Sequence, residues 1–308
     1  MSIHIRQVES LAEIEHFRVL EHLIWGEALE ATIPMHVLVT TIHNGGAILG
    51  AYADDGPAAT GGMVGLTYWW PGLDTPRTGA VGAQVSSPAH PAQVQAGTPP
   101  TENVGALRLK MCSHMAGVLP PWRGTGLGLR LKLAQREVIL AQGMTDWVTW
   151  TFDPLIRTNA AFNLHRLGAV CNTYHANLYG ELPDALNAGV PSDRCQVDWW
   201  LHSPRVVERV SGDEWRRHPH LPPAQVLSSA QNGHGLPLPP PALPQLDGSP
   251  LALPLPDDIY AVRSADAGLG AAWQQWMHAA LKPAFAAGYV AVDCARHEDG
   301  QWRYLLAA

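Results

Sequence analysis

Charged residues are scarce in this 308-residue chain, since Lys, Arg, Asp and Glu together make up 15% of it. The formal net charge is −7, and no block of lysine and arginine could follow a nucleic-acid backbone, so we expect no nucleic-acid partner. Long hydrophobic runs are lacking too, because no apolar stretch reaches the roughly 18 residues of a membrane-spanning helix. The first residues turn charged without an apolar signal core. We therefore expect a cytoplasmic protein, and its 46% hydrophobic content predicts a folded globular one.

Cysteine and histidine show none of the spacings that mark metal sites. The cysteines at 112, 171, 195 and 294 form no CxxC pair, which favours reduced, mostly buried thiols. Fifteen histidines are present, but no HExxH occurs, and the pair His218 and His220 opens a proline-rich segment as an expected surface pair. We expect no metal.

The first two thirds of the chain predict an α/β fold. Alternating and β-branched patterns predict strands at 3–8, 45–54, 61–70, 105–118, 146–153, 171–179 and 195–202. Helices are expected at 11–25, from 127 to a C-terminal stop at Gly143, and at 159–167. Residues 71–104 show no sustained period and are expected to be a long surface excursion. The order of elements predicts a partly parallel sheet with helices on its faces.

In the expected helix after residue 127, apolar residues recur at spacings of 4, 3, 4 and 3. They are Leu127, Leu131, Ala134, Val138 and Ala141. We expect this stripe to be the face that packs on the sheet.

The last third has a different composition. Eleven prolines between Pro219 and Pro256 exclude regular helix and central strand and favour an extended, polyproline-like connection. "IYAVRS" is expected to be a strand, followed by a helix from 265 to 287 kinked or broken near Pro283, and by a hairpin. The predicted division is therefore a main domain at 1–202, a proline-rich connector at 203–256 and a small β-α-β-β unit at 257–308 that docks on the main domain.

A glycine-rich segment, Arg123-Gly-Thr-Gly-Leu-Gly128, links the strand at 105–118 to the following helix. No lysine directly follows a glycine, which excludes a Walker loop, and Leu129 stands where a dinucleotide fingerprint needs its third glycine. Alternate glycines let backbone N–H groups turn toward a ligand, and the N-terminus of the helix adds unsatisfied N–H groups and partial positive charge. The segment is either an ordinary turn or a phosphate cradle with Arg123 as a cation.

"VLPPWRGTGLG" resembles the acyl-CoA pyrophosphate loop of the GNAT acyltransferases, with Arg123, Gly126 and Gly128 at the matching positions. "TNAAFNLHRLGAV" (158–170) is similar to the second helix of that family, and "WVTWTF" to its fifth strand. The resemblance covers roughly residues 1–202. It implies a mixed central sheet, flanked by helices, that splays between the strands at 105–118 and 146–153.

The same resemblance implies a site for acetyl-CoA or another short acyl-CoA. The pantetheine arm would enter the splay beside Ala116 and Val118, and Asn159 would bond to it. The pyrophosphate would lie on the loop, whose residues are Arg123, Gly124, Thr125, Gly126, Leu127 and Gly128.

Two positions depart from the family pattern. The family's asparagine falls on Arg157 by its distance from Gly168, so Asn159 stands two places late. The tyrosine that donates a proton to the departing thiolate in many members is replaced by Leu164, with His165 adjacent. That role does not carry over.

Acyl transfer to an amine needs a base, since an ammonium group has no lone pair. His114, on the strand that leads to the loop, is the base candidate, and a packed strand histidine is the alternative. Tyr179 and Tyr174 are candidates for the acid, and core or edge-strand tyrosines are the alternative. Asp193 and Arg194 either bind a charged acceptor or pair with each other at a turn.

The leading hypothesis is an N-acyltransferase that moves a short acyl group from acyl-CoA to the amine of a small molecule, with amino acids as one suggested class of acceptor. The first alternative is a CoA-binding sensor or scaffold with reduced catalysis, and the second is an adaptor that presents the proline-rich segment. Edge strands and few surface charges are compatible with a homodimer.

Overall fold

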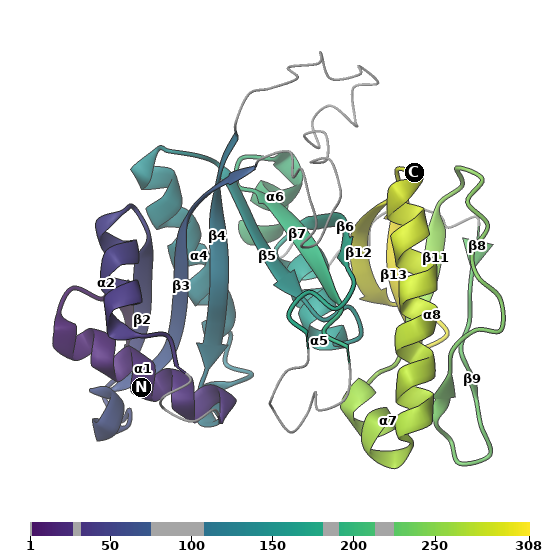
Figure 1. Cartoon of the computed structure of the whole chain (residues 1–308), viewed down its shortest axis with the longest axis horizontal. Helices are drawn as coiled ribbons and strands as arrows, with labels where there is room; N and C mark the ends of the chain where they lie inside the picture. Colours follow the sequence, from purple (N-terminus) through teal and green to yellow (C-terminus); the bar gives the residue numbers. More distant parts are fainter. Residues whose placement is uncertain (1, 27–31, 75–107, 181–190, 213–224) are drawn as a thin grey trace. The chain divides into compact units, whose positions relative to one another are not determined.

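The computed structural model describes residues 2–26, 32–74, 108–180, 191–212 and 225–308. They form two compact units (Figure 1), of which the first ends at Trp150 and the second holds Thr151–Ala308. These two units do not coincide with the domains predicted from composition, whose boundaries are at 202 and 256. Those domain boundaries stay a prediction. No helix in the described ranges has the length and apolar character needed to cross a membrane. The expected excursion at 71–104 falls mostly outside the described residues.

The first unit contains a mixed sheet. Its strands lie side by side in the order β1 (Ile3–Gln7), β2 (Ala47–Ala53), β3 (Met63–Asp74), β4 (Arg108–Val118) and β5 (Trp147–Phe152). Pairing is antiparallel from β1 to β4 and parallel between β4 and β5. Helices α1 (Leu11–Trp25) and α2 (Met35–His43) cover one face of this sheet, and α4 (Leu127–Gln142) covers the other (Figure 1). The mixed α/β architecture expected from the sequence is confirmed.

Helix α1 begins and ends where local signals predict. The Ser10 side chain accepts a hydrogen bond from the Glu13 N–H, and the Glu13 carboxylate accepts from the Ser10 N–H, which completes a capping box. Gly26 ends the helix with φ = 72°, a left-handed conformation that glycine adopts without strain. Helix α2 has no side-chain cap and was not predicted.

The buried face of α4 differs from the predicted stripe. Leu127 and Leu131 are buried as expected, but Ala134 and Val138 are only half-buried and Ala141 is exposed. The residues that complete the buried face are Lys132, Gln135 and Ile139. The apolar pattern alone could not locate this face, because two of its members are polar and are stabilised by partners on other elements.

The second unit contains strands in the order β7 (Arg194–Trp200), β6 (Val170–His175), β12 (Val290–Arg296), β13 (Trp302–Ala307), β11 (Leu251–Leu255) and β8 (Gln225–Val226). Its helices are α5 (Arg157–Ala160), which continues as a π-helical stretch over Ala161–Arg166, α6 (Pro204–Val210), α7 (Ile259–Ala265) and the long α8 (Ala267–Ala286). A separate two-stranded pair joins β9 (Ala230–Gln231) to β10 (Pro237–Leu238). Strands β6 and β7 therefore share one core with residues 251–308.

Two expectations for the C-terminal region were wrong. "IYAVRS" forms helix α7, capped by the Asp258 carboxylate, and the first strand of the β-α-β-β order is β11, inside the proline-rich segment. Helix α8 also continues through Pro283 to Ala286 without a break.

Strand β11 tolerates a proline because of where its partners end. The N–H of Leu227 donates to the Ala252 carbonyl at 3.0 Å, so the main chain of Ala252 faces β8. Pro254 faces the same side by the two-residue period of a strand, and β8 pairs only with Leu251 and Ala252. The missing N–H of Pro254 therefore costs no ladder bond. All five residues of β11 are buried, so this part of the segment is not an exposed adaptor motif.

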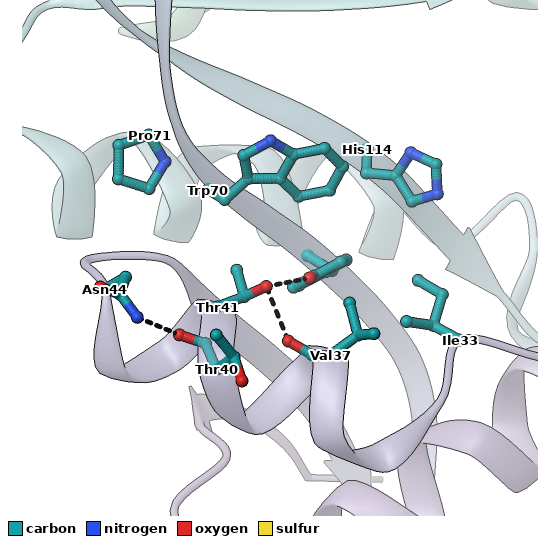
Figure 2. A pocket seen from close by; sticks show the side chains of 9 residues that line it. Ile33, Val37, Thr40, Thr41, Asn44, Trp70, Pro71 and His114 are labelled. Atoms are coloured by element: carbon teal, nitrogen blue, oxygen red, sulfur yellow. Dashed lines mark hydrogen bonds between the residues drawn. The ribbon is translucent and has the colours of Figure 1, made fainter.

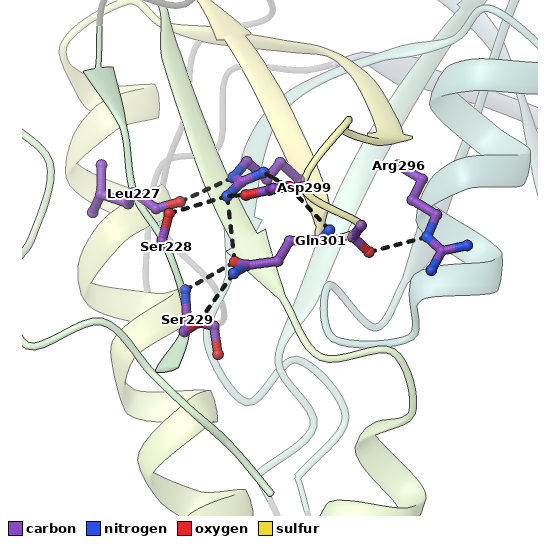
Figure 3. A network of polar contacts seen from close by, with 8 residues as sticks. Leu227, Ser228, Ser229, Arg296, Asp299 and Gln301 are labelled. Atoms are coloured by element: carbon purple, nitrogen blue, oxygen red, sulfur yellow. Dashed lines mark hydrogen bonds and ion pairs between the residues drawn. The ribbon is translucent and has the colours of Figure 1, made fainter. Parts of the chain in front are cut away.

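A buried arginine fastens the proline-rich segment to the final hairpin (Figure 3). The Arg303 guanidinium donates to the Leu227 carbonyl at 3.0 Å and to both carboxylate oxygens of Asp299 at 2.8 and 2.6 Å. Gln301 exchanges hydrogen bonds with the main chain of Ser229. Because these contacts satisfy the buried charge, the segment from 225 to 231 is part of the packed unit.

Candidate functional site

The glycine-rich segment connects β4 to α4 through a short 3-10 turn, Pro120–Trp122. Gly124 and Gly126 have φ values of 77° and 80°, a region that residues with a Cβ rarely adopt, and Gly126 is the N-terminal cap of α4. A Cβ built on Gly124, Gly126 or Gly128 would meet no atom within 4 Å. The glycines therefore serve the turn and leave its outer surface open.

The backbone amides of this loop are unsatisfied. Within the described chain, the N–H groups from Gly124 to Leu129 donate to no other protein group, and the first amide with an acceptor is that of Arg130, bonded to Gly126. Six consecutive donors without an acceptor among the described residues thus lie at the N-terminus of a 16-residue helix, where the helix dipole adds positive charge. Such a surface can bind phosphate groups.

Strand β4 separates from β5 near the middle of β4. The two strands pair at Met111–Val148 and Cys112–Thr149, and no further pair between them follows in the described residues. Ser113 on β4 and Trp150 on β5 are the first residues beyond this pairing, a point that we call the fork.

Beyond the fork, one edge of β4 is open. The Leu119 N–H donates to the Val64 carbonyl on β3, so by strand alternation the main chains of Ala116 and Val118 face away from β3. The Arg123 Nε–H donates to the Val118 carbonyl at 3.0 Å, which ties the arginine to the end of the strand. The open edge and the amide loop therefore follow one another along the chain.

His114 occupies a β-bulge on the same strand. Ser113 pairs with Trp69 and Met115 pairs with Tyr68, so β4 has one residue more than β3 at this point. Bulges redirect side chains and often occur beside functional sites.

The side chain of His114 lies at a pocket of about 380 Å³ between α2, β3 and β4 (Figure 2). Its ring centroid lies 5.1 Å from that of Trp70 and 6.2 Å from that of Tyr68. The Tyr68 hydroxyl donates to Thr41 Oγ1 at 2.7 Å, and Thr41 donates to the Val37 carbonyl. Ile33, Thr40, Asn44 and Pro71 complete the lining.

The surroundings of His114 keep its imidazole neutral near pH 7. The Tyr68 and Trp70 rings lie against the imidazole, and this partial burial lowers the pKa of His114 below 6.5. A neutral imidazole can accept a proton.

A buried lysine stands at the fork, and sequence reasoning missed it. Lys132 Nζ donates to Ser113 Oγ and to Gln135 Oε1, each at 3.0 Å, and lies 3.7 Å from the centroid of the Trp150 ring. Its side chain is 3% exposed, and burial lowers its pKa to about 7. One lysine in a helix carries no local signal of burial, because the partners that make burial tolerable come from β4 and β5.

The remaining site candidates lie in the second unit. The Tyr174 hydroxyl is buried and donates to Asp193 Oδ2 at 2.7 Å, and burial together with this bond raises the pKa of Tyr174. Tyr179 is 52% exposed, and its hydroxyl shares a hydrogen bond of 2.9 Å with Thr151 Oγ1. The proton of Tyr174 is thus held by a carboxylate, whereas the Tyr179 side chain is exposed and bonds only to another hydroxyl among the described contacts. The Arg194 guanidinium lies 5.6 Å from the Tyr179 ring centroid and donates to the Asp193 carbonyl.

Asn159 is exposed on α5. Arg157, at the position of the family's asparagine, donates to the Asp257 carbonyl at 2.9 Å. Leu164 is fully buried, and His165 bonds to Asp293 at 2.8 Å. No group of three potential metal ligands occurs among the described residues.

No family model matches the chain, and no curated protein does. Among solved structures, a putative GNAT acetyltransferase from Desulfovibrio desulfuricans is similar at 13% identity and a TM-score of 0.41, covering 65% of this chain and 99% of its own. NAA60 from Arabidopsis thaliana, in complex with acetyl-CoA, is similar at 13% identity and a TM-score of 0.42. The match covers 66% of this chain and 100% of NAA60. An IAA acetyltransferase from Bacillus cereus is similar at 10% identity and a TM-score of 0.39. The match covers 64% of this chain and 98% of the acetyltransferase. This likeness concerns only the arrangement of strands and helices.

Proposed function

We propose that this protein is an N-acyltransferase that moves a short acyl group, such as acetyl, from an acyl-CoA to the amine of a small molecule. The observation that carries the proposal is the row of unsatisfied amides from Gly124 to Leu129, placed directly after a strand with an open edge. A diphosphate bound to these amides would leave the rest of the coenzyme beside Ala116 and Val118. Main-chain groups at that edge can then pair with the amides of the pantetheine arm as a neighbouring strand would.

The pocket at His114 is the proposed acceptor site. Its volume of about 380 Å³ suits a small molecule, and its Tyr68, Trp70 and Pro71 walls favour an apolar or aromatic body. His114 lines this pocket and directly follows Ser113 at the fork, so it would lie close to both substrates. Tyr179 and Tyr174, which belong to the second unit, stay candidates for the acid on the sequence alone.

The proposed reaction is direct attack of the amine nitrogen on the thioester carbonyl. The nitrogen needs its lone pair, and a neutral His114 would take the proton that the nitrogen loses as the C–N bond forms. The C–S bond then breaks, and CoA leaves as a thiolate that needs a proton.

The test is CoA binding to a Gly128→Val variant. Gly128 is in α4 with a negative φ and open space around it, so valine fits the free protein. The added side chain would stand where the diphosphate approaches. We expect the CoA dissociation constant, measured by calorimetry, to rise at least tenfold, while an Ala141→Val control at the exposed C-terminal end of α4 binds as the wild type does.

A wild-type protein that binds no CoA, or a Gly128→Val variant that binds it unchanged, would overturn the proposal. CoA binding without acyl transfer to any amine in a mass-spectrometric screen would instead favour a sensor or scaffold.

A further inference from the structure

The acyl transfer proposed above needs a proton donor for the departing thiolate, and the fork holds a group of this kind. Lys132 approaches from α4 and meets both strands at the first residues beyond their pairing, Ser113 on β4 and Trp150 on β5. An amine at this point borders the end of the open edge of β4, farthest from the amide loop. A coenzyme that enters from the loop would bring its sulfur end to the fork.

The hydrogen bonds around Ser113 leave its own proton available. Ser113 Oγ accepts from Lys132 Nζ at 3.0 Å and from Gln135 Nε2 at 3.2 Å. The hydroxyl hydrogen has only a long contact of 3.4 Å to Gln135 Oε1, which already accepts from Lys132. Ser113 is therefore a donor backed by an ammonium group.

The protonation state of Lys132 suits this task. Ser113, Gln135 and Trp150 are among the groups that face Nζ, and none of these three titrates. Cys112 and His114, the chain neighbours of Ser113, are neutral near pH 7, because burial raises the pKa of Cys112 and lowers that of His114. Burial also lowers the pKa of Lys132 to about 7, so it can release and regain a proton near neutrality.

We propose that Ser113 and Lys132 together protonate the CoA thiolate, a role that rests on the proposed acyl transfer. As the C–S bond breaks, its electron pair stays on sulfur, and the sulfur takes the hydroxyl proton of Ser113. The Ser113 oxygen takes a proton from Lys132, which becomes a neutral amine. Lys132 regains a proton from solvent, and the proton released by the acceptor nitrogen leaves through His114, so charge and atoms balance.

The experiment measures the pKa of the CoA thiol in the complex with the full chain, from the ultraviolet absorbance of the thiolate. In the complex, the thiolate and the Lys132 ammonium stabilise each other, so Lys132 stays charged above its own pKa of about 7. We therefore expect a thiol pKa about one to three pH units below the ordinary value in wild type. Lys132→Met should restore the ordinary value, and Ser113→Ala should raise it above that of wild type. Lys110→Met is the matched control, since Lys110 lies 5.1 Å from the Trp147 ring centroid before the fork and should leave the thiol unchanged.

Each outcome decides between the two proposals. An equal thiol pKa in wild type, Lys132→Met and Ser113→Ala complexes overturns the donor role and leaves CoA binding intact. Failure of the wild type to bind CoA overturns the acyltransferase proposal and this one with it. If circular dichroism shows that Lys132→Met is misfolded, the thiol pKa values of the Ser113→Ala and Lys132→Arg complexes decide whether the donor role holds. The arginine variant should keep a lowered thiol pKa, because it retains the charge.

Discussion

His114 is the residue at which the bulge of β4, the aromatic pocket and the fork meet. Its base role depends on the imidazole being neutral when the amine attacks, and the partial burial that lowers its pKa extends the neutral form to lower pH. Lys132, on the other face of the strand, would act in its charged form, which is lost as the pH rises through about 7. At the scale of residues, protonation of His114 would therefore limit activity at low pH, and deprotonation of Lys132 would limit it at high pH.

Replacing His114 by glutamine therefore has two expected effects. The value of kcat/KM should fall by about 100- to 10,000-fold, the usual contribution of a general base. In wild type, activity should increase as the pH rises through the lowered pKa of His114, since the imidazole becomes neutral, and this limb should be absent from the variant. Steady-state thiol release between pH 5 and 8 measures both. Wild-type rates and an unchanged profile would mean that His114 only packs against Trp70.

At the scale of elements, the loop and helix α4 use two glycines for different reasons. Gly126 caps the helix in a left-handed conformation, with φ = 80°. Gly128 is helical, and its missing side chain leaves open space beside the unsatisfied amides. Gly126 therefore serves the fold, whereas in the proposed function Gly128 would serve only a ligand, and stability measurements can separate the two roles.

Alanine at the two positions should shift the unfolding free energy in opposite directions. Gly126→Ala should destabilise the protein by about 1 kcal/mol, the cost of a left-handed residue with a Cβ. Gly128→Ala should stabilise it by about 0.5 kcal/mol through better helix propensity. Urea unfolding of both variants and of wild type measures the two changes in unfolding free energy. A loss of stability in Gly128→Ala would show that the fold itself needs the open space beside Gly128.

At the scale of the whole chain, distant segments share buried charges. Asp293 on β12 is fully buried and accepts from His165 at 2.8 Å and from Arg209 at 3.2 Å. Burial alone would raise the pKa of Asp293, but the His165 bond and the charges of the two groups and of Arg205 outweigh it and lower it. Strand β12 is in this way bound to the π-helical stretch that contains His165 and to α6, which contains Arg209.

Asp293→Ala should destabilise the second unit by about 3 to 5 kcal/mol, because it leaves buried donors without their acceptor. Asp257→Ala is the control, since that carboxylate is 71% exposed and lies 3.7 Å from Arg157. Its loss should cost less than about 1 kcal/mol. Hydrogen exchange of β6 and β12 during urea unfolding reports on this unit. Equal effects of the two variants would contradict the role of Asp293.

Local signals in the sequence determined much of this protein. The capping box of α1, the left-handed glycines and the strand patterns depend on neighbours a few residues apart, so they are visible in the chain itself. The glycine loop before α4 belongs to the same class. Its match to an acyl-CoA loop could be proposed because the geometry it needs is contained within six residues.

Only the tertiary structure decided which polar groups meet. The buried position of Lys132 depends on Ser113 and Trp150, and the bulge at His114 depends on the register of β3. Strand β11 exists because β13 and β8 lie beside it, although its composition predicted a connector. Pairing between distant segments satisfies backbone and charge only once they are in contact, and no local pattern records which segments those are.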